Sequence, residues 1–580
     1  MPRRACDACK IRKVKCDGDE SSDPCSNCRM SKLTCEYKQQ VRKRGRRPLS
    51  QSQLGPRRRV SRDAQLSDQY TDSNSHTSPT LSIYEVDLAA TVPYQDHTTP
   101  KSISGRSGVD INAQIQILHD ELVSSLLLYA PSLTLDVIVS GCIDIALRDV
   151  FPLGPLFHEP SIRQNVPLRR PVLRTDSIFW SSHGTGLVRL GNNQAMDDLA
   201  RLRAYTATTA LCASVSFLLP AERVTNVVMV GQAFLQTTRE ILKLYEDFDV
   251  VNPDSSSLVI RLCQASALHT CARTLVAWQR LDEALRLAEQ MRLYDERSYE
   301  GLPPLEAQMR RLAFWQLYIL DKYASLVEGT PMRMHSFSIG APITTKIRGE
   351  IETPLLVSHV QGECSDLEKQ LLAGFYLLQS MWAAAADVSL DLQILGRLCR
   401  PGAHTRIAEE ANRMNLAETY LRFIAVLDDF PPSLESLEPP STATDEWTVS
   451  SRRSFWLQRS HLLVSYHTLR MIFLQRFADL GLADLVGSRN DRSTLASRKM
   501  EIAHDFIIVI TSVPFDCLRA NGESCVAKIR KVGATLLEVI LQVETPQIVS
   551  RAKALFPRLM DVLTRLDSRA SDELNSEYLH

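Results

Sequence analysis

The sequence lacks any run of about 20 uninterrupted apolar residues, the length that a helix needs to cross a bilayer. Its opening decapeptide, MPRRACDACK, is basic but has no apolar run behind it, unlike a secretory signal. We therefore expect no membrane segment and an intracellular, reducing environment. In that environment cysteines are thiols or metal ligands and not disulfides.

Signatures of common enzyme classes are also missing. The segment SHGTGLVRLG (182–191) has neither the further glycine spacing nor the preceding strand of a dinucleotide-binding loop. No Walker loop and no His-Glu-x-x-His motif occurs, and His461 and His467 are six residues apart, the wrong spacing for one helical face. We therefore expect that the protein is not an enzyme.

Charge of one sign is not in excess, because 67 Lys and Arg residues balance 67 Asp and Glu residues. The balance hides an asymmetry along the chain. Residues 1–60 hold 17 basic against 6 acidic side chains, which leaves 50 against 61 for the remainder. A basic head on an acidic body indicates a polyanionic partner for the head alone.

Cysteine is plentiful, and six of the 14 cysteines fall in the first 35 residues. They form two Cys-x-x-Cys pairs, each followed after six residues by another cysteine: Cys6, Cys9, Cys16, Cys25, Cys28 and Cys35. A pair two residues apart can bind one tetrahedral zinc from a single turn, and six thiolates satisfy two zincs if two of them bridge. Lys10, Arg12, Lys13 and Lys15 would offset the residual negative charge. One zinc with two spare thiols is the alternative.

The segment ACDACKIRKVKCDGDESSDPCSNCRMSKLTC resembles the fungal binuclear zinc cluster, a DNA-binding domain with two short helices. The resemblance implies two zincs per chain and bridging by Cys6 and Cys25. Cys9 and Cys16 would then complete one site, and Cys28 and Cys35 the other.

The same resemblance implies roles for the basic residues. Lys13 would read guanine edges of a CGG triplet in the major groove, with Arg12 beside it. Phosphate contacts would come from Lys10, Lys15, Arg29 and Lys32. A solvated charged face is the alternative, most seriously for Lys32.

Residues 41–110 are predicted to be a linker, first basic and then rich in Ser and Thr, with too few large apolar residues to fold. Its basic residues indicate a nuclear import signal, a grip on the DNA backbone, or both. They are Arg42, Lys43, Arg44, Arg46, Arg47, Arg57, Arg58 and Arg59. A solvated linker is the alternative.

Residues 111–570 are predicted to be one all-α domain, and 571–580 an acidic tail. Apolar residues recur at helical spacing over 281–291, residues 309–326 are apolar nearly all round, and prolines punctuate the series. Ile111, Ile115, Leu118 and Leu122 have heptad spacing over only two heptads, which favours the first helix of this domain over a coiled coil.

The stretch from Ala284 to Met334 is similar to the core of the fungal-specific transcription factor domain. The similarity rests on an arginine pair, an aromatic helix with Trp and Asp, and Gly-x-Pro: Arg310, Arg311, Trp315, Asp321, Gly329 and Pro331. The sequence does not decide whether Arg311 pairs with Asp321.

These features predict a nuclear, sequence-specific DNA-binding transcription regulator that reads CGG-type triplets and acts with the transcription machinery. The resemblance to the family implies an RNA polymerase II pathway-specific activator. Its targets would be either a secondary-metabolite biosynthetic gene cluster or genes for sugar or other nutrient use. A homodimer without a clear coiled coil is compatible with the sequence. The alternative of another class is a DNA-tethered scaffold or co-regulator.

Overall fold

The chain divides into two compact units, Met1–Lys101 and Ser102–His580. In the first, the computed structural model describes residues 6–7, 9, 16–17, 24–30 and 34–37. In the second it describes 111–173, 193–220, 224, 226–340, 343, 353–357, 363–398, 406–435, 446–487 and 491–566. The predicted linker 41–110 and the predicted tail 571–580 lie outside these residues.

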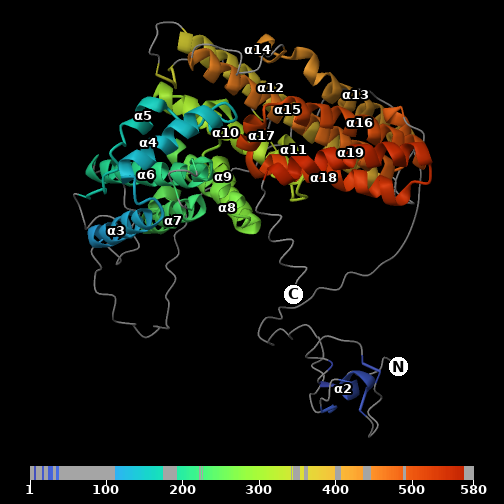
Figure 1. Ribbon diagram of the computed structural model, residues 1–580, viewed down its shortest axis with the longest axis horizontal. Helices are drawn as coiled ribbons and strands as arrows, with labels where there is room; N and C mark the ends of the chain where they lie inside the picture. The colour runs from blue at the N-terminus through green and yellow to red at the C-terminus, as the bar shows by residue number, and fades with distance from the viewer. Residues whose placement is uncertain are drawn as a thin grey trace, which may run out of the picture. The chain divides into compact units, whose positions relative to one another are not determined.

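The first unit contains one described helix, α2 (Ser26–Met30), within the cysteine-rich head (Figure 1). The other short helix implied by the resemblance falls mostly outside the described residues. Cys6, Cys9, Cys25 and Cys28 are buried and form a small cluster of their own. Among the described head residues the buried side chains are these cysteines, so we expect the fold of the head to depend on what the thiols bind.

The second unit is built from helices, and its described residues contain no strand. This confirms the prediction of an all-α body. The N-terminal elements are α3 (Ile111–Tyr129), α4 (Leu135–Ile145), the π-helix η1 (Ala146–Val150), α5 (Glu159–Arg163), α6 (Asn193–Val215) and the 3-10 turn η2 (Ser216–Leu218). They are followed by α7 (Val227–Val251), α8 (Ser255–Thr270), α9 (Thr274–Gln290), η3 (Glu296–Tyr299), α10 (Pro304–Leu326) and α11 (Ser336–Ile339).

The C-terminal part continues with longer helices. They are α12 (Glu363–Leu398), α13 (Arg406–Ala425), η4 (Val426–Asp429), α14 (Pro432–Glu435), α15 (Glu446–Asp479) and η6 (Ala483–Val486). The chain then forms α16 (Arg492–Ser512), α17 (Phe515–Ala520), α18 (Gly522–Gln542) and α19 (Pro546–Arg565). In Figure 1, α3 to α9 gather at one side of this unit and α16, α18 and α19 at the other.

Helix boundaries follow the local sequence. Pro303 precedes α10 and Pro514 precedes α17, as the proline pattern predicts. Asp254 caps α8 in a reciprocal capping box with Ser257. Most of α10 is buried, including Trp315, which agrees with its nearly uniform apolar sequence.

The first helix, α3, packs against α7. Ile115 and Leu122 are buried in the core of the unit, and Leu118 is partly buried against it. The heptad-like spacing therefore serves internal packing, as expected for the first helix of the body.

Helix α15 separates two hydrophobic cores. Its residues Leu462, Leu469 and Phe473 belong to the large cluster shared with α3 to α13. Val464 and Met471 belong to the smaller cluster shared with α16 to α19. The helix therefore buries two opposite faces, which is the position of a central element in a helical assembly.

One segment of α12, Asp366–Arg397, is long enough to span a membrane, and its most apolar 18-residue window has a mean hydropathy of 1.3. Of the residues in its most apolar window, 67% are buried inside the structure. Trp382 and Phe375 on this helix contribute to the large hydrophobic cluster. Burial of this kind is typical of a core helix.

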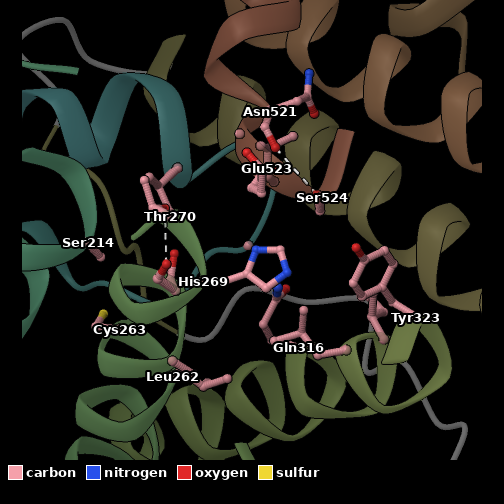
Figure 2. Close-up of a pocket in the computed structure, with 18 of the residues that line it drawn as sticks. Ser214, Leu262, Cys263, His269, Thr270, Gln316, Tyr323, Asn521, Glu523 and Ser524 are labelled. Carbon is pink, nitrogen blue, oxygen red and sulfur yellow. Dashed lines mark hydrogen bonds between the residues drawn. The ribbon is translucent and has the colours of Figure 1, made fainter. Parts of the chain in front are cut away.

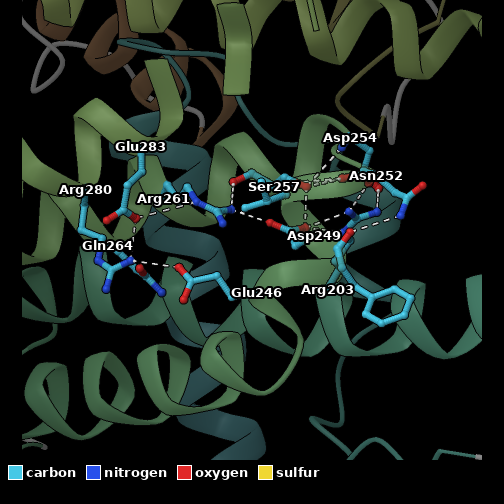
Figure 3. Close-up of polar contacts among 12 residues, drawn as sticks. Arg203, Glu246, Asp249, Asn252, Asp254, Ser257, Arg261, Gln264, Arg280 and Glu283 are labelled. Atoms are coloured by element: carbon cyan, nitrogen blue, oxygen red, sulfur yellow. Dashed lines mark hydrogen bonds and ion pairs between the residues drawn. The ribbon is translucent and has the colours of Figure 1, made fainter. Parts of the chain in front are cut away.

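A buried ionic network joins three helices near the N-terminal end of α8 (Figure 3). Asp249 at the end of α7 accepts hydrogen bonds from Arg203 of α6 at 2.8 Å and from Ser257 of α8 at 2.6 Å. Arg203 also pairs with Asp254 at 2.7 Å. Each buried charge thus has a partner of opposite sign, which offsets the cost of removing it from water.

A pocket of about 230 Å³ lies between α8, α9, α10, α12, α15 and α18 (Figure 2). His269 and Tyr323 point into it in this view, and Asn521, Glu523 and Ser524 close another side. Helices that belong to both hydrophobic clusters line it, so the pocket lies where the two clusters meet.

Candidate zinc centre and DNA-binding face

The six head cysteines form two overlapping groups of four. Within each group all four Sγ atoms lie within 4.8 Å of one another. One group is Cys6, Cys9, Cys16 and Cys25, and the other is Cys6, Cys25, Cys28 and Cys35. Cys6 and Cys25 belong to both, so the geometry places the shared thiols where the resemblance implies bridging ligands.

The sulfur separations fit tetrahedral zinc. A Zn–S bond of about 2.3 Å puts two ligands of one tetrahedron about 3.8 Å apart. Cys6 Sγ lies 3.9 Å from Cys25 Sγ and 3.6 Å from Cys28 Sγ, and Cys9 Sγ lies 3.6 Å from Cys25 Sγ. Two zinc ions would therefore fit the head, one held by each group of four thiols, with Cys6 and Cys25 available to both. When bound, zinc supplies the cross-links that hold this small head folded.

The second Cys-x-x-Cys pair is positioned by the start of α2. The Cys28 backbone N–H donates to Cys25 Sγ at 3.4 Å, and the Arg29 N–H donates to Cys25 O at 2.9 Å. The Cys28 N–H contact lowers the pKa of the Cys25 thiol, because a hydrogen bond to sulfur favours the thiolate. A thiolate is the form that binds zinc.

Asp17 holds the N-terminal end of α2 from outside the helix. Its Oδ1 accepts a hydrogen bond from the Ser26 backbone N–H at 3.0 Å, and its Oδ2 accepts one from Ser26 Oγ. The Ser26 hydroxyl contact lowers the pKa of Asp17. Because Asp17 follows the ligand Cys16 and Ser26 follows the ligand Cys25, this contact links the two halves of the cluster.

A second link joins the two ends of the head. The backbone N–H of Asp7 donates to the Glu36 carbonyl at 2.8 Å. The first and last ligands, Cys6 and Cys35, are therefore brought together by main-chain pairing as well as by their sulfurs.

Of the residues predicted to contact DNA, the structure describes Arg29. It is exposed in the last turn of α2. Lys10, Arg12, Lys13, Lys15 and Lys32 lie outside the described residues, and so do all eight basic residues of the predicted import segment. Their roles remain predictions.

Sequence reasoning missed two features of the candidate sites. The sequence gives no local signal for the Asp17 contact, because Asp17 lies nine residues before Ser26, whereas a capping side chain normally belongs to the residue at the helix start. Arg311 does not pair with Asp321. Arg311 binds Glu296 instead, while Asp321 accepts from Lys322 Nζ at 2.8 Å and from the backbone N–H of Arg333 at 3.0 Å.

The cysteines of the body are expected to act as small buried apolar residues, and most of those described do. Cys142, Cys212, Cys263, Cys517 and Cys525 are buried, and Cys271 is half-buried. Burial raises the pKa of the Cys525 thiol to about 12, which makes it a poor metal ligand and a poor nucleophile.

Comparison with family models agrees with both parts of the chain. Residues 4–44 match the fungal Zn(2)-Cys(6) binuclear cluster domain, and residues 195–425 match the fungal specific transcription factor domain. Each part of the chain is therefore similar to one of these domains, the head to the binuclear cluster domain and the body to the transcription factor domain. The second match covers the described structure from α6 to α13, and α15 to α19 follow it.

Individual relatives match over different lengths. A maltose fermentation regulatory protein of Saccharomyces cerevisiae is 54% identical over 43 residues, 7% of this chain and 8% of that protein. A citrinin biosynthesis transcriptional activator of Monascus ruber is 23% identical over 350 residues, 58% of this chain and 62% of that protein. An aurofusarin cluster transcription factor of Gibberella zeae is 36% identical over 78 residues, 13% and 12% of the two chains.

The chain therefore matches less than two thirds of the length of each of these curated relatives. No solved structure matches the chain.

Proposed function

We propose that this protein is a nuclear, sequence-specific DNA-binding regulator that acts with the RNA polymerase II transcription machinery as a pathway-specific activator. The observation that carries the proposal is the pair of four-thiol groups sharing Cys6 and Cys25, in a head that matches the zinc cluster domain. Both matched domains are transcription-factor domains, and we infer no enzymatic activity.

The proposed division of the chain follows the sequence. Residues 1–40 would bind two zincs and DNA, 41–110 would link and direct nuclear import, 111–570 would regulate, and 571–580 would form an acidic tail. The target would contain CGG triplets, read by Lys13. A homodimer, formed without a coiled coil, would bind two such triplets.

The pathway is proposed as a secondary-metabolite biosynthetic gene cluster. The support is the 350-residue match to the citrinin activator, which is long enough to include much of the body, whereas the maltose regulator matches over 43 residues. Regulation of sugar or nutrient genes is the second candidate. Transcript profiling after deletion of the gene distinguishes the two, because the affected genes would form one contiguous cluster only in the first case.

A DNA titration tests base reading by the head. Lys13→Ala should remove about 1–3 kcal/mol of discrimination between a CGG duplex and a scrambled duplex. The triple change of Arg57, Arg58 and Arg59 to Ala should preserve that ratio and flatten the log–log salt dependence by about one unit for each phosphate that is no longer neutralised. A full specificity ratio in Lys13→Ala would contradict the base-reading role.

A reporter assay separates an activator from a DNA-tethered scaffold. Fusing residues 102–580 to an unrelated DNA-binding domain should activate a reporter that carries that domain's site. A scaffold would recruit partner proteins to the site without raising transcription by itself.

A further inference from the structure

The pocket between α8, α10 and α18 is mostly apolar but contains a buried cation. Leu262, Ile319, Leu320 and Leu378 form apolar walls, and Tyr323 and Trp382 add two aromatic rings. Its volume of about 230 Å³ is below the roughly 300–1,000 Å³ of pockets for drug-sized ligands. A ligand here would be small and largely apolar.

Lys528 is the cation, and it is 1% exposed. It lies on α18 and lines the pocket, with Nζ 5.2 Å from the centre of the Tyr323 ring and 5.8 Å from that of Trp382. Within the described part of the chain, no carboxylate oxygen lies within 4.0 Å of this ammonium, and no hydrogen bond to it occurs. Two ring faces offset only part of the cost of burying a charge.

The other buried lysines of the described residues show what is missing. Lys322 pairs with Asp321 at 2.8 Å, and Lys499 pairs with Glu538 at 3.2 Å. This fold therefore supplies an anion to Lys322 and Lys499 and supplies none to Lys528, the one of the three that lines a pocket.

A second unpartnered donor faces the same space. Trp382 is 1% exposed, and its Nε1–H has no hydrogen-bond partner within the described structure. Buried polar atoms without partners are uncommon in folded proteins, so an unpartnered indole N–H and an unpaired ammonium among the residues that line one pocket point to a missing hydrogen-bond acceptor.

The remaining titratable groups do not supply the missing anion. Glu523 pairs with Arg530 at 3.0 Å, and Glu328 accepts from the Tyr323 hydroxyl at 3.0 Å. Burial, and then the charge of Lys528, lowers the pKa of His461 to about 3, which keeps that imidazole neutral. Burial also lowers the pKa of Lys528 to about 8, so most of the ammonium stays charged at neutral pH.

We propose that this pocket binds a small, largely apolar carboxylic acid, with its carboxylate at Lys528 Nζ and Trp382 Nε1 and its apolar part between α8 and α10. Binding would pair the lysine and satisfy the indole N–H in one step. The site goes beyond the proposed function, and its test is independent of DNA binding.

The test uses the full chain and three probe acids: benzoate, hexanoate and indole-3-acetate. Benzamide serves as the neutral counterpart of benzoate. We expect at least one acid to bind with a Kd on the order of 1 mM or tighter in ligand-observed NMR. Benzamide should bind about tenfold or more weakly than benzoate if benzoate is that acid, since it cannot pair with the ammonium.

Substitutions assign the binding to the pocket. Lys528→Met keeps the length of the side chain and removes the charge. It should weaken acid binding about tenfold or more while raising the melting temperature, because an unpaired buried ammonium is removed. Lys531→Met, on the exposed side of the same helix, should change neither. A lysine with only a structural role would instead lower the melting temperature when replaced.

Three outcomes would overturn the proposal. They are no binding by any of the three acids, acid affinity unchanged in Lys528→Met, and equal affinity for an acid and its neutral amide. Trp382→Phe, which keeps a ring but loses the N–H, gives a second reading if Lys528→Met does not fold. It should weaken acid binding more than benzamide binding, because a hydrogen bond to a carboxylate is stronger than one to a neutral amide oxygen.

Discussion

Arg261 Nη1 lies 2.5 Å from Asp249 Oδ2, and both side chains are almost completely buried. Asp249 also binds Arg203 and Ser257, so one carboxylate joins α6, α7 and α8. Removing one partner of such a network leaves a buried charge without compensation, which is far more costly than losing a surface ion pair.

We therefore expect Asp249→Ala to lower the free energy of unfolding of the helical body by about 3–5 kcal/mol. Chemical denaturation followed by far-UV circular dichroism measures this, because nearly all described helix lies in the body. Glu240→Ala, which breaks the more exposed pair with Lys243, should cost about 1 kcal/mol or less. Equal losses in the two variants would show that the buried network is not a stabilising centre.

The shared thiols predict an asymmetry between cysteine substitutions in the head. Cys25→Ala removes a ligand from both groups of four, so the protein should lose both zincs. Cys35→Ala removes a ligand from one group only and should retain up to one zinc. Elemental analysis of the purified proteins measures the content, with Cys271→Ala in the body as the control that keeps two. A full zinc retained in Cys25→Ala would argue against bridging.

Substitution of Asp17 tests the hydrogen-bonded link to Ser26 between the two halves of the cluster and leaves every metal ligand in place. Asp17→Ala removes the acceptors for the Ser26 N–H and hydroxyl, so zinc should transfer to a chelator several times faster. Asp17→Asn keeps one oxygen acceptor and should recover much of the wild-type rate. Identical transfer rates in all three proteins would mean that α2 is held by its zinc ligands alone.

His461 predicts a dependence of stability on pH. Burial, followed by the charge of Lys528, lowers the pKa of this imidazole to about 3 in the folded state, against about 6.5 when unfolded. The unfolded chain therefore binds one more proton between these values, and stability falls as the pH drops below 6.5. The limiting slope is about 1.4 kcal/mol per pH unit for one group.

Unfolding measurements between pH 8 and pH 5 check this. His461→Gln keeps a hydrogen-bond donor for Asn521. Its free energy of unfolding should fall less steeply as the pH drops, with a slope that corresponds to about one proton fewer than in the wild type. His467, whose pKa burial lowers to about 4, should account for part of what remains. Parallel curves for wild type and variant would contradict the assignment.

The sequence predicted the head and the body for different reasons. Zinc coordination requires particular ligands at particular spacings, so six cysteines were enough to identify the cluster. Helix α10 was predicted because its residues are apolar on nearly every face. The helical spacing over 281–291 also matches the structure, because the apolar face of α9 is buried and Met291, at the C-cap of that helix, packs against the same cluster.

The polar interior could not be predicted in this way. Arg261 and Lys528 both lie in helices with ordinary spacing, and nothing local indicates that one has a carboxylate partner and the other has none. Partner choice depends on how separate helices pack, since Asp249 of α7 contacts Arg261 of α8 and Trp382 of α12 lies beside Lys528 of α18. The same limit applies to Arg311, whose partner Glu296 lies in η3, outside its own helix.

Helix α15 contributes one face to each of the two hydrophobic clusters, so the packing of one cluster cannot change independently of the other. Its 34 residues form a rod about 51 Å long at about 1.5 Å per residue. Turning this rod about its axis would move Leu462 and Val464 through the same angle and disturb the packing on both sides at once. His461 on the same helix also lines the pocket. A ligand that displaced α15 would therefore alter the side-chain packing of both hydrophobic clusters at once.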